Sequence, residues 1–359
     1  MGTFLFKNGR FEIQKKRFTN EQEAMDDKRT WNEYWIETNG TVEFGEWLRS
    51  KGYLAAAVTV AGATEYSGTL RKLRSFLDEA EPQLVYLLVN TWRHQGKAIT
   101  YKELREAILA GDLDLGLLED WRQDYSRFVV EHLQPAWRDA MEAANKAKRA
   151  KYPKWYFDPY EDGVREWTEN RAAEFVTSIT ETQMQGLRAV VQRAAVLEDM
   201  SVDQLARAVR PMVGLYQGQT IANLNYYNNL IKNGTSERRA LDLSIRYGAR
   251  QHRYRGYLIA RTELAFAYNK GAHEGTKQAQ AKGYMGETVK VWCTADDERV
   301  CPVCRALEGK IVAMDDDFDF QTKLQADNPG IRRTPPAHPS CRCAVMYKEI
   351  TPPTPGRKP

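Results

Sequence analysis

This chain of 359 residues has few cysteines, no long apolar run and only a small net charge. It contains 5 cysteines and carries a formal net charge of +4, which by itself is too small to indicate a nucleic-acid-binding protein. The longest apolar run, residues 54–63, is far too short to cross a bilayer, and no signal peptide follows Met1. We therefore expect no membrane partner and a reducing compartment, in which cysteines stay available for metal instead of forming disulfides.

Charge is distributed unevenly along the chain. Residues 232–282 contain eleven Lys and Arg against four Asp and Glu, a local charge of +7. Residues 283–319 contain nine acidic residues against four basic ones, a local charge of −5. This asymmetry predicts a basic helical surface beside an acidic segment near the C-terminus.

Four of the five cysteines gather near the C-terminus at two close spacings. Cys301 and Cys304 form a C-x2-C pair. Cys341 and Cys343 form a second pair, and His338 lies three residues before Cys341. Two short groups of soft ligands joined by a loop have the spacing of a closed zinc site. We predict that Cys301, Cys304, His338 and Cys341 bind one structural Zn²⁺. Cys343 is either the substitute for Cys341 or a core residue.

Two other interpretations fit the same residues. The cysteines would pair as disulfides in an oxidising compartment, which the absence of a secretory signal argues against. Alternatively, one thiol would be catalytic with His338 as its base, but the sequence offers no third residue to orient that histidine. β-prone residues and one short helical turn surround the cysteines and predict a small α+β lobe: strands at 289–292, 310–314 and 343–347, and the turn at 305–308.

Helical patterns dominate the rest of the chain after Gly68. Thr100 with Glu103, and Ser201 with Gln204, are capping boxes that each start a helix. The apolar periodicity predicts further helices: 117–150, kinked at Pro135, then 164–197, 219–232 and a long helical stretch over 236–282. Gly248 and Gly256 are the positions at which this last stretch could be interrupted.

Four arginines lie on one face of the last of these helices, because they are spaced seven, four and three residues apart: Arg239, Arg246, Arg250 and Arg253. Only two acidic residues lie between Ser236 and Arg261, so local neutralisation is poor. One interpretation is a solvated stripe of arginines. The other is a surface that faces acidic or phosphate groups, such as double-stranded DNA bound weakly and without sequence preference.

Several motifs follow one another in the second half of the chain: IARTE at 259–263, N-x-G at 269–271, VW at 291–292, DERVCPVC at 297–304, LEG at 307–309 and PPAHPSCRC at 335–343. Together they resemble the head-morphogenesis, or Mu F-like, minor head protein family of tailed bacteriophages. The resemblance is specific over residues 236–347, weaker back to Trp167, and absent from the first 150 residues. Because the family has threonine or serine more often at Cys293, that cysteine is left outside the site.

The resemblance implies a low-copy virion protein of the phage head, assembled in the host cytoplasm. It implies association with the portal protein and the inner capsid surface, help in head assembly, DNA packaging or ejection, and no enzymatic activity. Arg261, Glu263 and Asn269 are then structural residues of the family motif. Arg261 and Glu263 are two apart and point to different sides of a helix, so they cannot pair with each other. We expect each to fix the helix to the zinc lobe.

We therefore predict a mainly α protein with an elongated multi-helix body and a small α+β C-terminal lobe that a structural zinc ion holds together. Residues 152–163, with two prolines among aromatic residues, form the clearest break in the helical pattern. The predicted segments are an irregular N-terminal arm or small subdomain (1–65), a helical N-terminal domain (66–151), a linker (152–163), the helical body of the head-morphogenesis domain (164–285), the zinc-knuckle lobe (286–350) and a disordered tail (351–359).

Two other functional classes fit the sequence less well. A zinc-ribbon regulator that binds nucleic acid would need dense basic residues around the cysteines, but acidic residues that repel phosphate stand there: Asp296, Asp297, Glu298, Asp315, Asp316 and Asp317. A zinc hydrolase would need an H-E-x-x-H pair or two histidines at ligand spacing, and the sequence has neither.

Overall fold

The computed structural model describes residues 4–7, 10–13, 63–111, 115–194, 201–295, 300–320 and 333–350. The chain forms two compact units, Met1–Glu65 and Tyr66–Pro359. In the first unit, strands β1 (Phe4–Lys7) and β2 (Arg10–Ile13) pair as an antiparallel hairpin. The rest of the predicted arm and the predicted tail, 351–359, lie outside the described residues.

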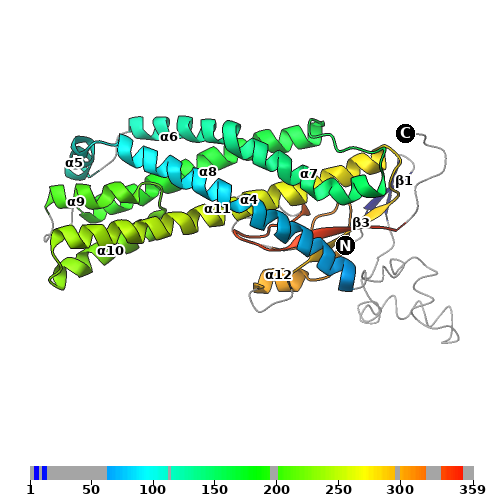
Figure 1. Ribbon diagram of the computed structural model, residues 1–359. Helices are drawn as coiled ribbons and strands as arrows, with labels where there is room; N and C mark the ends of the chain where they lie inside the picture. The colour runs from blue at the N-terminus through cyan, green and yellow to red at the C-terminus, as the bar shows by residue number, and fades with distance from the viewer. Residues whose placement is uncertain are drawn as a thin grey trace. The chain divides into compact units, whose positions relative to one another are not determined.

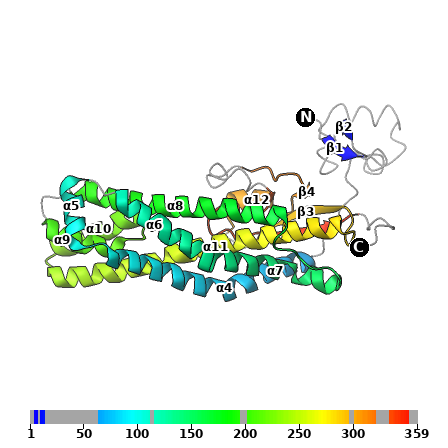
Figure 2. The same cartoon turned by 90° about the horizontal axis from the view of Figure 1, so that it is seen from above.

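The second unit is mainly α, as predicted (Figure 1). Its helices are α4 (Ala63–Ala98), α5 (Tyr101–Ala110), α6 (Leu115–Phe128), a π-helical turn (Val129–Leu133), α7 (Gln134–Lys151), α8 (Asp162–Ala194), α9 (Val202–Val209), a 3₁₀ turn (Arg210–Met212), α10 (Gln217–Lys232) and α11 (Glu237–Ala281). Figures 1 and 2 show α4, α8 and α11 running along the length of this unit. Within the described part of the chain, no helix combines the length and apolar character needed to span a membrane.

Local sequence signals start and interrupt these helices. Thr100 and Ser201 both form the predicted capping boxes, with Glu103 and Gln204. The kink predicted at Pro135 is a π-helical turn that ends two residues earlier, at Leu133, and the N–H of Gln134 bonds to the carbonyl of Val129. Proline has no N–H for the normal helical bond, so the register widens by one residue before it.

Helix α11 is the element on which the second unit is built. It extends unbroken over the predicted range and packs against α7, α8 and α10. Two glycines allow α7 to approach very closely. A Cβ at Gly271 would lie 2.4 Å from Cα of Met141, and one at Gly275 would lie 2.1 Å from Oδ1 of Asn145. Any larger residue at these positions would force α7 away from α11.

Residues 152–163 are packed against the end of α11, although sequence analysis assigned them to a linker. Trp155 is buried against Ala279 and Met285. The backbone of Asp158 exchanges two hydrogen bonds with the side chain of Gln278, at 2.8 and 2.9 Å. The predicted boundary therefore falls inside the compact unit Tyr66–Pro359.

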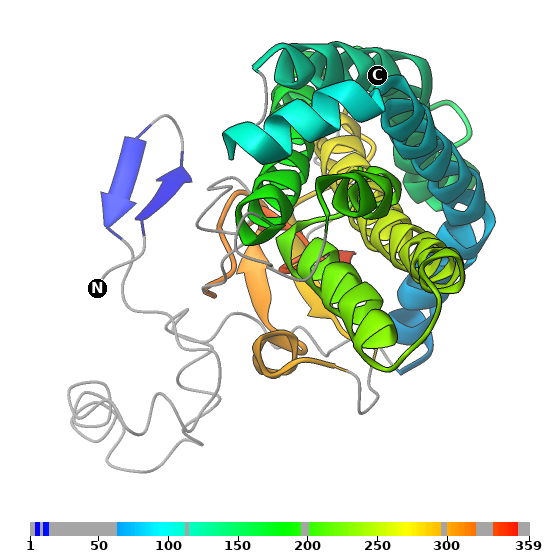
Figure 3. The ribbon, with the colours of Figure 1, turned by 90° about the vertical axis from the view of Figure 1, so that its left-hand side faces the viewer.

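The C-terminal lobe, residues 286–350, contains a three-stranded antiparallel sheet in the order β4-β3-β5. Its elements are β3 (Thr288–Cys293), α12 (Pro302–Leu307), β4 (Ile311–Ala313) and β5 (Ala344–Glu349), close to the predicted ranges. Figure 3 shows these strands, in orange and red, beside the helices. Trp292, Phe318 and Val345 of the lobe share a buried core with Phe266 of α11. The lobe therefore packs directly on the central helix.

Candidate metal centre

The fold brings the five residues of the predicted zinc site into one group, here called the Cys/His cluster: Cys301, Cys304, His338, Cys341 and Cys343. Nε2 of His338 lies 3.2 Å from Sγ of Cys301 and 3.3 Å from Sγ of Cys304. Sγ of Cys304 lies 3.7 Å from Sγ of Cys341. Ligand atoms at these separations can hold a metal ion.

Helix α12 positions the first two members of the cluster. Cys301 is the N-cap residue, with extended backbone, and its Sγ accepts a hydrogen bond from the N–H of Cys304 at 3.3 Å. Pro302 follows at the first helical position, where its fixed φ suits the helix and its missing N–H is not needed. The C-x2-C spacing therefore puts both sulfur atoms at one end of a short helix.

The other members stand on the loop that leads into β5. The N–H of Cys341 bonds to the carbonyl of His338 at 3.1 Å, which closes a turn. Ser340, inside this turn, has φ of 59°, in the left-handed region that non-glycine residues rarely adopt. Its N–H donates to Oγ1 of Thr262 on α11 at 2.8 Å. The central helix thus holds the turn that carries the histidine.

A backbone contact sets the orientation of the imidazole. Nδ1 of His338 lies 2.9 Å from the carbonyl oxygen of Pro339. A carbonyl oxygen only accepts hydrogen bonds, so Nδ1 must carry the proton. In the neutral ring the lone pair is then on Nε2, which faces Cys301 and Cys304. This is the tautomer that a metal ligand needs, fixed as in many metal sites by a second hydrogen bond.

Hydrogen bonds within the cluster move the pKa values of its members apart. Those from Cys304 and Cys343 hold the pKa of the Cys341 thiol well below its usual range, against the effect of burial. The hydrogen bond with Cys341 raises the pKa of His338 to about 9. The same kind of bond to Cys341 raises the pKa of Cys304. Several ionised thiols so close together repel one another, so their ionisation needs a bound cation.

Cys341 and Cys343 are both close enough to serve as ligands. Cys304 belongs to two overlapping groups, one with Cys301 and His338 and one with Cys341 and Cys343, in each of which all ligand atoms lie within 4.8 Å of one another. The preference for Cys341 stays a prediction. The fifth cysteine, Cys293, lies on β3 with its Sγ directed at a backbone carbonyl, and burial raises its pKa to about 12. It is outside both groups.

Asn269 of α11 attaches the lobe to the helical body. Its Oδ1 accepts a hydrogen bond from the N–H of Val345 at 3.1 Å, and its Nδ2 lies 3.5 Å from the carbonyl oxygen of Cys343. The side chain is 1% exposed. The Asn269 side chain therefore bonds to the backbone at the point where the chain leaves the Cys/His cluster and enters β5. These bonds resemble those that a neighbouring strand would make.

Arg261 and Glu263 have different partners from those expected. Nε of Arg261 lies 2.6 Å from Oε1 of Glu81 on α4, and Glu263 forms a bidentate pair with Arg171 on α8. The expectation that both fix α11 to the zinc lobe is wrong. They brace it against α4 and α8 because their side chains point to different sides of the helix. Thr262 points between them and meets the lobe, a role that sequence analysis missed although the residue lies inside the IARTE motif.

Residues 193–346 match the family model described as phage Mu protein F like protein. Over this range the chain is similar to the phage Mu F-like family. The matched range contains α9, α10, α11, the whole Cys/His cluster and most of β5. The resemblance seen in the sequence motifs is therefore confirmed over this range. Comparison with curated proteins and with solved structures gave no match.

The Mu F-like segment also carries the predicted arginine stripe, Arg239, Arg246, Arg250 and Arg253. All four side chains are exposed on the first half of α11. Within the residues that the structure describes, none of the four forms an ion pair with a carboxylate. The guanidinium of Arg250 lies 5.7 Å from the ring centre of Tyr247. The stripe is therefore free to meet a partner, but its role in binding DNA stays a prediction.

Proposed function

We propose that this chain is a minor head protein of a tailed phage, located in the virion, that associates with the portal protein and the inner capsid surface. It would help head assembly, DNA packaging or DNA ejection, without enzymatic activity. The observation that carries this proposal is the Mu F-like match over residues 193–346. Those residues include the central helix α11, against which α7, α8 and α10 pack.

Residues before the matched range support the same helix. Glu81 of α4 and Arg171 of α8 form buried ion pairs with Arg261 and Glu263. Met141 of α7 meets Gly271. The part of the chain outside the family match thus completes the helical body of the second unit instead of forming a separate catalytic module.

Zinc is the metal that the Cys/His cluster fits best. Four soft donors around Zn²⁺, with Zn–S bonds of about 2.3 Å, lie roughly 3.8 Å apart in a tetrahedron. The Cys304 and Cys341 sulfur atoms are 3.7 Å apart. When bound, the ion would cross-link α12 to the loop before β5. A closed set of protein ligands leaves no open position for substrate, so the ion would be structural and not hydrolytic.

We place the proposed contact with double-stranded DNA on α11 and not on the lobe. Asp315 lies 3.6 Å from Lys277, and Asp317 lies 3.5 Å from Arg333, so these two basic residues near the lobe sheet already face carboxylates. The arginine stripe has no such neutralisation within the described residues. A zinc-ribbon regulator would instead bind nucleic acid through the lobe, which this charge pattern disfavours.

Co-expression with the portal protein of the same phage tests the proposed association. The full-length chain should be retained on immobilised portal protein at moderate salt, and an unrelated helical protein of similar charge should not. Retention on capsid protein alone would move the partner to the inner capsid surface. Retention on neither would reject direct binding to the head vertex.

A further inference from the structure

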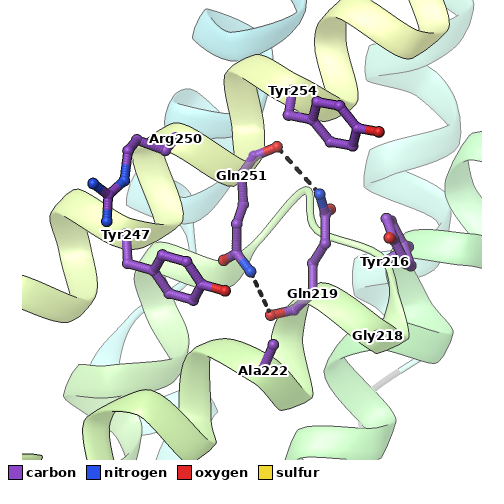
Figure 4. A pocket seen from close by; sticks show the side chains of 8 residues that line it. All are labelled: Tyr216, Gly218, Gln219, Ala222, Tyr247, Arg250, Gln251 and Tyr254. Atoms are coloured by element: carbon purple, nitrogen blue, oxygen red, sulfur yellow. Dashed lines mark hydrogen bonds between the residues drawn. The ribbon is translucent and has the colours of Figure 1, made fainter.

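A cavity of about 400 Å³ opens between the first turn of α10 and the middle of α11, away from the Cys/His cluster (Figure 4). Eight residues line it: Tyr216, Gly218, Gln219, Ala222, Tyr247, Arg250, Gln251 and Tyr254. The lining contains three aromatic rings, one arginine and no acidic residue. It lies inside the Mu F-like range, and Arg250 belongs to the arginine stripe.

Two glutamines form the floor of this pocket, and one has an unused acceptor. Nε2 of Gln219 donates to the carbonyl of Gln251 at 3.3 Å, and Nε2 of Gln251 donates to the carbonyl of Gln219 at 3.2 Å. Gln219 is only 6% exposed, yet its Oε1 has no hydrogen-bond partner. Figure 4 shows its amide directed toward the space between Tyr216 and Tyr254. Such a buried acceptor calls for a donor, which a bound water or a ligand can supply.

The positive end of a helix forms one side of the same pocket. Tyr216 is the N-cap of α10, a helix of 16 residues, and makes no side-chain capping bond. Within the described residues, the N–H of Gly218 has no hydrogen-bond partner. Free N–H groups at a helix N-terminus bind anions, above all phosphate. Gly218 has no side chain to cover this N–H.

A buried arginine adds positive potential behind the pocket. Arg255 is 6% exposed and donates to the carbonyl of Gly214 and, at 2.8 Å, to Oγ1 of Thr182. Both acceptors are neutral, and within the described part of the chain no carboxylate pairs with it. Its charge lies close enough to act on Tyr216. Together with Arg250 and the α10 N-terminus, it favours an anionic ligand.

The tyrosines supply flat apolar faces at the mouth. Tyr254 is 57% exposed and Tyr216 is 42% exposed, so both rings are accessible to a ligand from solvent. Bases of unpaired nucleic acid stack on such rings, whereas bases inside a duplex are already stacked on one another. The rings and the hydrogen-bond acceptor suit a base, and the helix N-terminus with Arg250 suits a phosphate, so one cavity offers partners for two parts of a nucleotide.

We propose that this pocket binds an unpaired nucleotide of single-stranded DNA. The base stacks on Tyr216 or Tyr254 and donates an N–H to Oε1 of Gln219, and a phosphate group binds the N–H of Gly218 and Arg250. The proposal rests on the proposed DNA contact of the arginine stripe, which continues along α11 for about 20 Å at 1.5 Å per residue. That length suits several successive phosphates of a strand better than a free mononucleotide.

Fluorescence anisotropy with the full-length protein tests this proposal. Three labelled 12-mers are compared at the same salt: a single strand, the same strand with abasic sugars throughout, and a duplex. The wild-type protein should bind the single strand about tenfold more tightly than the abasic strand, since one stacked base contributes on that order. The double variant Tyr216→Leu/Tyr254→Leu should lose most of this preference and keep its duplex affinity. Tyr86→Leu, which removes a ring that is 61% exposed on α4, is the matched control.

The outcomes separate this proposal from the proposed function. Equal affinity of the wild-type protein for normal and abasic strands, with duplex binding intact, overturns the nucleotide pocket and leaves the arginine stripe standing. Tight binding of dAMP alone, with no gain from the longer strand, also overturns the strand assignment. No binding to any DNA rejects both the pocket and the proposed DNA contact. Melting curves of the double variant confirm that any loss is not caused by unfolding.

Discussion

The side-chain amide of Asn269 bonds to the backbone N–H of Val345 at 3.1 Å, 76 residues further along the chain. This contact joins the central helix to the start of β5, where the chain leaves the Cys/His cluster. Both groups are buried, so water cannot replace either partner. The helical body and the C-terminal lobe are therefore coupled through a polar contact as well as through apolar packing.

Asn269→Leu should destabilise the protein by about 2 kcal/mol, because it leaves the N–H of Val345 buried without an acceptor. Chemical denaturation followed by circular dichroism measures the change. Asn229→Ala, at an exposed position of α10, is the control and should change the free energy of unfolding by less than about 0.5 kcal/mol. Equal effects of the two variants would show that the contact does not matter for stability.

Elemental analysis of protein purified without a histidine tag should find close to one zinc per chain. Cys304→Ser and His338→Ala should abolish binding, whereas Cys293→Ser should not, because Cys293 lies outside the cluster. Chelation should lower the melting temperature, since much of the folding free energy of such a lobe comes from its metal. Comparison of Cys341→Ser with Cys343→Ser identifies the fourth ligand, and we expect loss of zinc only in the former. A fully folded protein that contains no metal would contradict this account.

Stability should fall as the pH drops from 6.5 toward 4. Burial lowers the pKa of His252 to about 4, while the unfolded chain has the ordinary value of about 6.5. In that window the unfolded state binds a proton at His252 that the folded state does not bind, so His252 alone makes acid favour unfolding by about 3 kcal/mol at most. His252→Gln keeps a donor for the carbonyl of Val213, which Nε2 of His252 reaches at 2.7 Å. It should reduce this pH dependence, whereas His94→Gln on the exposed side of α4 should leave it unchanged.

The sequence predicts elements whose signals are local. The capping boxes at Thr100 and Ser201, the length of α11 and the C-x2-C knuckle depend on residues a few positions apart. Partners far along the chain could not be predicted in this way. The aromatic residues around Trp155 have the composition of a linker, and only the end of α11 shows that they are buried. The ion pair of Arg261 with Glu81 joins residues 180 apart, and the pocket around Gln219 exists only where two helices meet.

The arginine stripe should give the protein weak, salt-sensitive affinity for duplex DNA. Each phosphate contact contributes about 0.9 to the slope of log K against log salt concentration. Replacement of Arg246, Arg250 and Arg253 by glutamine should therefore lower that slope by as much as about 2.7. Replacement of Arg122, Arg127 and Arg149, exposed on α6 and α7, changes the net charge equally and should leave the slope almost unchanged. Equal effects of the two triple variants would assign the affinity to net charge alone.

The proposal that the chain is a portal-associated minor head protein is tested most directly by counting it in purified phage heads. Quantitative mass spectrometry would compare heads assembled with and without portal protein, with the major capsid protein as the internal reference. The account predicts a few copies per head when the portal is present and a large loss when it is absent. The same amount in both kinds of head would contradict portal association, and absence from both would contradict a place in the virion.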